Sequence, residues 1–197
     1  MCNIRFNGVQ KILLLIPLFN FLIAQAPDTL WTKIYGDTGW EEGYSVQQTL
    51  DNGYIITGEK FSTTTYEYDL FLMKTDANGD SLWLRTYGGL YYDGGLYVLQ
   101  TRDSGYIVCG KSWVDSINHT DIYLIKVKSN GDLQWEKSYG GFGYDEGWGV
   151  VETYDGYLIT GNTTSYSNSG DVFLMKVDSI GDSLEFMVVL DVIWHIP

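Results

Sequence analysis

Three pairs of adjacent residues, each an aromatic followed by an acid, recur along the chain and suit the recognition of a sugar. The pairs are Trp40-Glu41, Tyr92-Asp93 and Tyr144-Asp145. An aromatic ring can stack on the apolar face of a sugar, while a carboxylate accepts hydrogen bonds from its hydroxyl groups. These six residues are therefore the predicted ligand-binding residues. The alternative is that each aromatic packs between structural units and each acid caps a turn or pairs with a lysine, and recurrence in every unit favours it.

No pair of acids has the arrangement that glycoside hydrolysis requires. That reaction needs two carboxyl groups about 5 to 10 Å apart, on either side of one bond. Glu41-Glu42 and Asp145-Glu146 are adjacent in sequence, and neighbouring side chains of an extended chain point to opposite sides. The sequence therefore predicts no catalytic residue.

The remaining reactive residue types also lack the partners that their chemistry needs. The turn at residues 76–80, DANGD, lacks the Gly and the distant Glu of an EF-hand loop, and the second copy has Lys128 at its first acid position. We interpret it as a hairpin turn. Cys109 stands in the strand position that Thr57 and Thr160 hold elsewhere, where we expect a small, half-buried side chain. We therefore predict no metal site and no cofactor.

Six cations also recur at fixed places in the chain. They are Lys74, Lys126 and Lys176 within an apolar strand, and Lys33, Arg85 and Lys137 two residues after a Trp. An anion-binding site is one interpretation of this pattern. We favour a structural role, in which each aliphatic stem packs along apolar surface and each charged head meets a neighbouring carboxylate.

All of these residues belong to a repeat. Trp31, Trp83 and Trp135 are spaced at intervals of 52 residues. The block DLFLMKTDANGDSLWLRTYG at residues 69–88 returns at residues 121–140 as DIYLIKVKSNGDLQWEKSYG, and in part once more later in the chain. A faithful repeat of this length indicates one supersecondary unit that is used several times.

Each repeat unit contains four strand candidates. In the first unit they are residues 44–49, 54–58, 70–75 and 81–87. The third candidate is apolar on both faces in every unit, so we expect it to be covered on both sides. Four antiparallel strands per unit predict an all-β fold, a partial β-propeller of three four-stranded antiparallel blades in an open arc. The predicted boundaries are a lone strand at 28–35, blades at 36–87, 88–139 and 140–186, and an aberrant tail at 187–197.

The repeat resembles that of secreted bacterial β-propellers. GYIITG…DLFLMKTDANGDSLW…YGG is similar to this repeat, and DANGDSLW resembles the tail of quinoprotein-type blades, in which an Asp-Gly turn precedes Leu-Trp. The resemblance covers residues 28–184 and implies a propeller fold. Proteins with such repeats differ in function, and some are grouped with secreted endoglucanases, so fold alone implies no activity. A quinone-dependent enzyme is a further alternative, for which this sequence offers no cofactor ligand that we can name.

Both ends of the chain depart from the repeat. Residues 28–35 read as a fourth strand without its own unit, and Glu185 stands where the repeat has Trp. Because propellers have about four to eight blades, we expect the chain to be part of a longer propeller, or an arc that a second copy completes. Exposed end blades also predict self-association.

The N-terminal segment and the charge predict an exported acidic protein. Arg5 and Lys11 precede an apolar run at residues 12–24, which has the length of a signal-peptide core and is short for a membrane span. We predict a signal peptide at residues 1–26, a location outside the cell or in the cell envelope, and no membrane span in the mature chain. The net charge of −13 disfavours nucleic acid as a partner.

These inferences combine into one predicted function. The chain is expected to be a non-catalytic secreted or cell-surface β-propeller module that binds a protein or another ligand. The alternative is a carbohydrate-binding or carbohydrate-active, endoglucanase-like propeller. The expected partner is accordingly a glycan or a protein.

Overall fold

We analysed a computed structural model of the chain, which describes residues 30–114, 119–166 and 169–189, with only the backbone for residues 185–189. The chain divides into two units, Met1–Thr32 and Lys33–Pro197, and every described strand lies in the second. The predicted signal peptide and residues 190–197 of the predicted tail lie outside the described residues. The described part is all-β, and within it no helix is long and apolar enough to cross a membrane.

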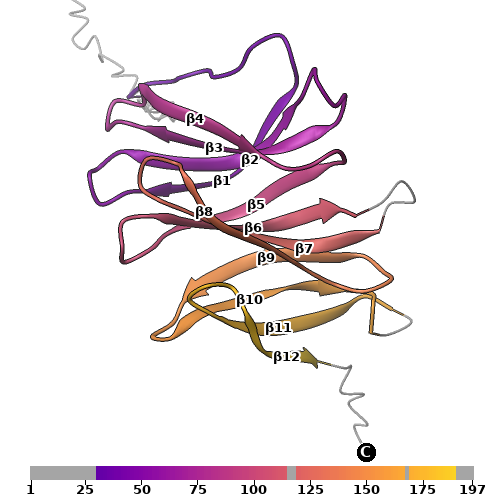
Figure 1. Ribbon diagram of the computed structural model, residues 1–197. Helices are drawn as coiled ribbons and strands as arrows, with labels where there is room; N and C mark the ends of the chain where they lie inside the picture. Colours follow the sequence, from indigo (N-terminus) through magenta and orange to yellow (C-terminus); the bar gives the residue numbers. More distant parts are fainter. Residues whose placement is uncertain (1–29, 115–118, 167–168, 190–197) are drawn as a thin grey trace, which may run out of the picture. The chain divides into compact units, whose positions relative to one another are not determined.

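The strands form three four-stranded antiparallel sheets that follow one another along the sequence (Figure 1), which confirms the predicted fold class. We call these sheets blades 1, 2 and 3. Blade 1 contains β1 (Glu41–Gln48), β2 (Tyr54–Phe61), β3 (Tyr68–Thr75) and β4 (Ser81–Tyr87). Blade 2 contains β5 (Asp93–Gln100), β6 (Tyr106–Trp113), β7 (Thr120–Val127) and β8 (Leu133–Tyr139). Blade 3 contains β9 (Asp145–Glu152), β10 (Gly156–Thr163), β11 (Asp171–Asp178) and β12 (Ser183–Val189). Among the described residues the three sheets do not close into a ring.

Turns organised by aspartate join the strands of each blade. At the β3–β4 turn the Asp76 carboxylate accepts hydrogen bonds from the backbone N–H groups of Asn78 and Asp80, both at 2.8 Å. Gly79 lies between them at φ +79°, a left-handed conformation that glycine adopts without a steric penalty. Asp178 makes the equivalent pair of bonds at the β11–β12 turn, at 3.0 and 2.8 Å. The acids of this motif therefore build a hairpin turn.

Two apolar cores lie between neighbouring blades. The core of blades 1 and 2 consists of Ile55, Leu70, Leu72, Val98, Tyr106, Val108, Tyr123, Ile125 and Val127. The core of blades 2 and 3 consists of Ile107, Cys109, Ile122, Leu124, Val150, Tyr157, Ile159, Phe173, Met175 and Val177. Because successive side chains of a strand point to opposite faces, β7 contributes to both cores.

The two faces of each blade are distinguished by their third strand. The A face carries Leu70 and Leu72 in blade 1, Ile122 and Leu124 in blade 2, and Val172 and Leu174 in blade 3. The B face carries Phe71 and Met73 in blade 1, Tyr123 and Ile125 in blade 2, and Phe173 and Met175 in blade 3. Each core therefore joins the A face of one blade to the B face of the next.

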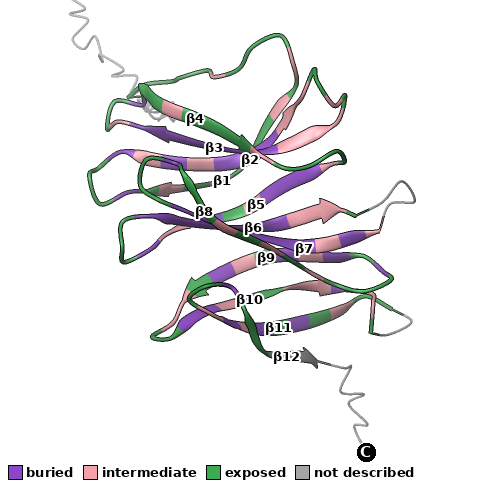
Figure 2. Cartoon of the chain, in the orientation of Figure 1, coloured by how far each residue is buried: buried purple, intermediate pink, exposed green. Residues whose placement is uncertain are grey.

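The expectation that every third strand is covered on both faces is wrong for blade 3. Buried residues follow β3 and β7, whereas exposed residues alternate along β11 (Figure 2). Phe173 is fully buried, but Val172 is 58% and Leu174 38% exposed. The reason is that no further described blade packs against the A face of blade 3.

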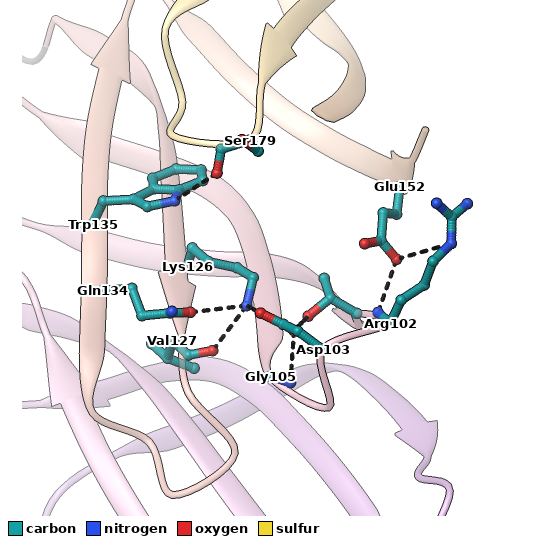
Figure 3. Close-up of polar contacts among 10 residues, drawn as sticks. Arg102, Asp103, Gly105, Lys126, Val127, Gln134, Trp135, Glu152 and Ser179 are labelled. Atoms are coloured by element: carbon teal, nitrogen blue, oxygen red, sulfur yellow. Dashed lines mark hydrogen bonds and ion pairs between the residues drawn. The ribbon is translucent and has the colours of Figure 1, made fainter. Parts of the chain in front are cut away.

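The recurring lysines pair with acids, as the structural interpretation predicts. Lys126 is 3% exposed, and its ammonium group lies 2.8 Å from the Asp103 carboxylate (Figure 3). It also donates hydrogen bonds to Gln134 and to the carbonyl of Val127. The equivalent pairs are Lys74 with Asp51 at 2.9 Å and Lys176 with Asp155 at 2.7 Å.

A tyrosine at the end of β4 and another at the end of β8 each join their blade to the next. The hydroxyl group of Tyr87 donates to the carbonyl of Gly131 at 2.6 Å, and that of Tyr139 donates to the carbonyl of Gly181. Beside the second contact, Lys137 pairs with an acid of the same turn, Asp182, at 3.0 Å. These polar contacts fix the outer strand of one blade against the β3–β4 type turn of its neighbour.

Residues 33–35 make the same contacts to blade 1 without forming a strand. The Tyr35 hydroxyl donates to the carbonyl of Gly79, and Lys33 pairs with Asp80 at 2.7 Å. The described part of the predicted lone strand, residues 30–35, is nevertheless not a strand, because a strand needs a hydrogen-bonded neighbour. At the other end, β12 continues to Val189, so the first residues of the predicted tail belong to blade 3.

Cys109 is more deeply buried than its sequence position suggested. The side chain is fully buried in the core of blades 2 and 3, where its thiol lies 3.5 Å from the carbonyl oxygen of Gly147. Burial in apolar surroundings raises the pKa of the Cys109 thiol, which disfavours the nucleophilic thiolate.

Candidate functional site

The six predicted ligand-binding residues lie at one end of the blades. Each acid is the first residue of the first strand of its blade, and each aromatic directly precedes that strand. In an antiparallel sheet this end also carries the loop between the second and third strands, and we call it the loop end. The strand predicted from the sequence begins at Tyr44, which leaves these pairs in the segment between blades, outside the sheet. The structure instead begins β1 at Glu41.

A β-bulge explains this difference. The β1–β2 register shifts between Gly43 and Ser45, so Tyr44 is an extra residue in the ladder. The same shift occurs between Gly95 and Tyr97 in blade 2. A bulge interrupts the alternation of inward and outward side chains. The residues before Tyr44 therefore do not continue the period-two pattern that marks a strand in a sequence.

The backbone of each aromatic residue is held by the end of the second strand of its blade or, in blade 3, by the residue that follows it. The carbonyl of Trp40 accepts a hydrogen bond from the N–H of Phe61, and the carbonyl of Tyr92 accepts one from Trp113, both at 2.8 Å. The carbonyl of Tyr144 accepts the equivalent bond at 2.9 Å. The three aromatic residues therefore occupy equivalent positions on rigid strand ends.

The acids cap the turn that precedes each blade. The carboxylate of Asp93 accepts a hydrogen bond from the N–H of Gly89 at 2.7 Å, and that of Asp145 accepts one from Gly141 at 3.0 Å. Glu41 accepts the equivalent bond at 3.3 Å. The structure therefore shows all three acids in the turn-capping role that the sequence analysis gave as its alternative.

Burial and further partners distinguish these three acids. Asp93 is 2% and Asp145 1% exposed, and burial raises the pKa of Asp93 against the opposing effect of its hydrogen bonds. Asp145 also accepts hydrogen bonds from the hydroxyl groups of Thr163 and, at 2.5 Å, Ser165. Glu41 instead pairs with Lys60 at 2.5 Å.

The aromatic partners have more contact with solvent than Asp93 and Asp145. Trp40 is 71% and Tyr144 52% exposed, whereas Tyr92 is half-buried. Other exposed aromatic side chains at the loop end are Tyr66, Tyr91, Phe142 and Tyr166. Ligand binding by the six predicted residues stays a prediction, to which the structure adds that Trp40 and Tyr144 are accessible.

Tyr92 is the centre of a cluster that sequence reasoning missed. The Tyr92 cluster consists of Glu59, Tyr68, Tyr92, Lys111 and Trp113. The Tyr92 ring lies 5.4 Å from the Trp113 ring and 5.9 Å from the Tyr68 ring, centroid to centroid. The Lys111 ammonium lies 5.2 Å from the Tyr92 centroid, a distance at which a cation is attracted to an aromatic ring.

Polar contacts extend the Tyr92 cluster across all three blades. The Tyr92 hydroxyl donates to the Glu59 carboxylate, which is 7% exposed, and burial raises the pKa of Glu59. Lys111 pairs with Glu146 of blade 3 at 3.3 Å. The available sequence signal was a departure from the repeat, because Glu59 and Lys111 occupy equivalent positions in β2 and β6 but differ in charge.

Two polar cavities open near the predicted residues. A cavity of about 270 Å³ at the loop end of blade 1 is lined by Asp37, Thr38, Lys60, Phe61, Ser62, Thr63, Thr64, Asp69 and Thr86. A second, of about 250 Å³, is lined by Gly88, Gly89, Asp93, Ser112, Tyr123, Glu136, Lys137 and Ser138. Hydroxyl and carboxylate groups dominate both linings, so both suit a polar ligand.

The described residues contain no group of three or more His, Cys, Asp and Glu side chains that could hold a metal ion. Comparison of the chain with protein-family models and with curated proteins found no match.

Proposed function

We propose that the chain is a non-catalytic binding module whose ligand contacts the exposed aromatic residues of the loop end. The observation that carries this proposal is the different environment of the two residues of the blade 3 pair, Tyr144 and Asp145. Asp93 and Asp145 are buried and hydrogen-bonded within the fold, whereas the ring of Tyr144 faces solvent. A carboxylate held in this way is poorly placed to exchange protons with a substrate, while an exposed ring on a rigid strand end can stack.

A carbohydrate is the second candidate ligand, and the polar cavity of blade 1 favours it. Three consecutive hydroxyl side chains, Ser62, Thr63 and Thr64, line that cavity together with Asp37 and Asp69. The backbone carbonyl of Trp40 accepts a hydrogen bond from Phe61, which lines the same cavity and directly precedes Ser62. A ring beside hydroxyl groups and carboxylates matches the apolar face and the hydroxyl rim of a sugar.

Glycan binding by matched variants tests the carbohydrate candidate. We expect the Trp40→Ala, Tyr144→Ala double variant to lose about tenfold or more in affinity for any glycan bound by the wild type, since stacking aromatics dominate such interfaces. Tyr154→Ala is the control, because Tyr154 is 97% exposed and lies at the opposite end of blade 3. A glycan array with no bound ligand, or equal binding by all three proteins, contradicts the carbohydrate candidate.

Site-specific photo-crosslinking tests the broader proposal. A photoreactive amino acid at position 40 or 144 should capture a partner in the producing cell, and the same group at position 154 should not. Capture at position 154 alone, or at none of the three positions, contradicts binding at the loop end.

We also propose that the chain is exported, on the basis of its N-terminal segment. Two cations followed by the apolar run of residues 12–24 support removal of a signal peptide at about residue 26. The intact mass of the protein recovered from outside the cytoplasm would be lower by that segment. Recovery of only the unprocessed chain, inside the cell, contradicts export.

A further inference from the structure

The A face of blade 3 is apolar and exposed at positions that are buried in the other blades. Leu70 and Ile122 are 0% and 1% exposed, whereas Val172 at the equivalent position is 58% exposed. Leu72 and Leu124 are both fully buried, whereas their equivalent Leu174 is 38% exposed. In blades 1 and 2 these positions contact the B face of the following blade.

The B face of blade 1 is also exposed at a position that is buried in the other blades. Val98 and Val150 are both 2% exposed in the inter-blade cores, whereas the equivalent Val46 is 64% exposed. A cavity of about 270 Å³ lies against this face. It is lined by Tyr35, Gly36, Asp37, Glu41, Gly43, Ile56, Lys60, Phe71, Met73 and Leu84. The equivalents of Ile56, Phe71 and Met73 in blade 2 are Val108, Tyr123 and Ile125, which pack against Leu70 and Leu72.

We propose that the A face of blade 3 binds the B face of blade 1 in a second copy of this chain. Val172 and Leu174 of one copy would enter the cavity beside Phe71 and Met73 of the other. The occupant is a second copy because the chain itself carries both halves of an interface that it already forms twice, between blades 1 and 2 and between blades 2 and 3. Residues of the same type meet in the same positions in both internal interfaces.

The charged pairs at these faces agree with this proposal. The side chains of Lys74 and Lys126 are 5% and 4% exposed, whereas that of the equivalent Lys176 is 34% exposed. Tyr106 of blade 2 lies with Lys74 and Asp51 of blade 1 around a shared cavity. In a second copy, Tyr54 holds the position equivalent to Tyr106 and would cover the Lys176–Asp155 pair in the same way.

The fourth strands show how the two copies would join. Residues 33–35 already contact the β3–β4 turn of blade 1 as β4 and β8 contact the turns of the next blades. Docking would place them beside β11 of the other copy, where they compete with the end of β12. We expect residues 33–35 to be favoured at this position over the end of β12. The sequence WTKIY at residues 31–35 matches WLRTY and WEKSY at the ends of β4 and β8, whereas residues 185–189 of β12 read EFMVV.

A head-to-tail contact of this kind either closes into a ring or continues into a filament. The three described blades of two copies would together supply six, within the range of about four to eight blades in closed propellers. We therefore expect a closed dimer in which both interfaces are equivalent.

Sedimentation velocity of the chain as isolated from its producing cell tests the proposal, with two variants that each remove one face. The double variant Val172→Asp, Leu174→Asp places charges on the A face of blade 3. The variant Val46→Asp places a charge on the B face of blade 1. All three positions are at least 38% exposed, so the fold should tolerate the changes, and circular dichroism verifies that it does. Phe142→Asp is the control, because Phe142 is 95% exposed at the loop end.

The expected results distinguish head-to-tail pairing from other contacts. Wild type and Phe142→Asp should be dimers, and each face variant alone should be a monomer. An equimolar mixture of the two face variants should regain a 1:1 complex, because one supplies an intact A face and the other an intact B face. A monomeric wild type, a dimer that survives either face variant, or growth into filaments overturns the proposal.

Discussion

Lys126 and Asp103 illustrate how a charged residue can serve the fold at a place where sequence alone also permits a binding site. The lysine stem lies in the blade and its head is held by Asp103, Gln134 and the Val127 carbonyl. Burial raises the pKa of Asp103, but hydrogen bonds from Lys126, Thr101 and Gly105 outweigh this effect and lower it to about 2. The pair therefore stabilises the folded state as long as Asp103 is ionised.

Asp103→Asn is expected to lower the free energy of unfolding by about 1 to 3 kcal/mol at neutral pH, because Lys126 stays buried without a carboxylate. The pKa of Asp103 is lower in the folded state than in the unfolded state. The ionised carboxylate therefore stabilises the folded state at pH values above the unfolded pKa, and this stabilisation is lost as the pH falls to the folded pKa. The difference between wild type and variant should therefore narrow from pH 3.8 to about pH 2. Urea unfolding at a series of pH values measures both effects.

Asp182→Asn is the matched control for this prediction. Asp182 pairs with Lys137, and the two side chains are 60% and 40% exposed. Exposed ion pairs contribute about 1 kcal/mol or less to stability. Equal losses of unfolding free energy in Asp103→Asn and Asp182→Asn would show that burial of the lysine does not determine how strongly an ion pair stabilises this fold.

The bulged first strand depends on a glycine in the strand beside it. In each blade this glycine pairs next to the extra residue, at Gly58, Gly110 and Gly161. A Cβ atom added to Gly110 would lie 1.9 Å from the carbonyl oxygen of Gly94, far inside van der Waals contact. The recurring Gly at the end of YIITG, YIVCG and YLITG is thus required by the close approach of two backbones.

Gly110→Ala should therefore destabilise the protein by about 3 kcal/mol or more, since backbone atoms must move to relieve the overlap. Thermal unfolding followed by circular dichroism measures this loss. Gly89→Ala is the control, because a Cβ atom there would meet nothing within 4 Å, and we expect a change of less than about 0.5 kcal/mol. A tolerated Gly110→Ala substitution would show that the bulge can move to another register.

At the scale of the whole molecule, equivalent residues differ in their contribution to stability according to their blade. Leu124 is fully buried between blades 2 and 3, whereas Leu174 at the equivalent place in blade 3 is 38% exposed. The two side chains are identical and belong to equivalent strands. Only the presence of a following blade distinguishes them.

Leu124→Ala is expected to cost about 2 to 5 kcal/mol, which is typical for the loss of a buried leucine side chain. Leu174→Ala should cost less than about 1 kcal/mol in dilute solution, because its side chain already contacts water. Urea unfolding at low protein concentration measures both values. If the proposed dimer forms, the cost of Leu174→Ala should rise with protein concentration, and a constant, small cost at every concentration would contradict it.

The amino-acid sequence is enough to predict the repeat, the four strands of each blade and the hairpin turns, because these features depend on local residues such as Asp76 and Gly79. It also indicated that the recurring lysines meet acids. Three further features depend on a partner from another strand or blade and are visible only in the folded chain. They are the bulge at Tyr44, the burial of Asp93 and Asp145, and the contact of Glu59 with Tyr92. Exposure of the A face of blade 3 is likewise a property of its surroundings, since Val172 and Leu174 have the same sequence pattern as their buried equivalents.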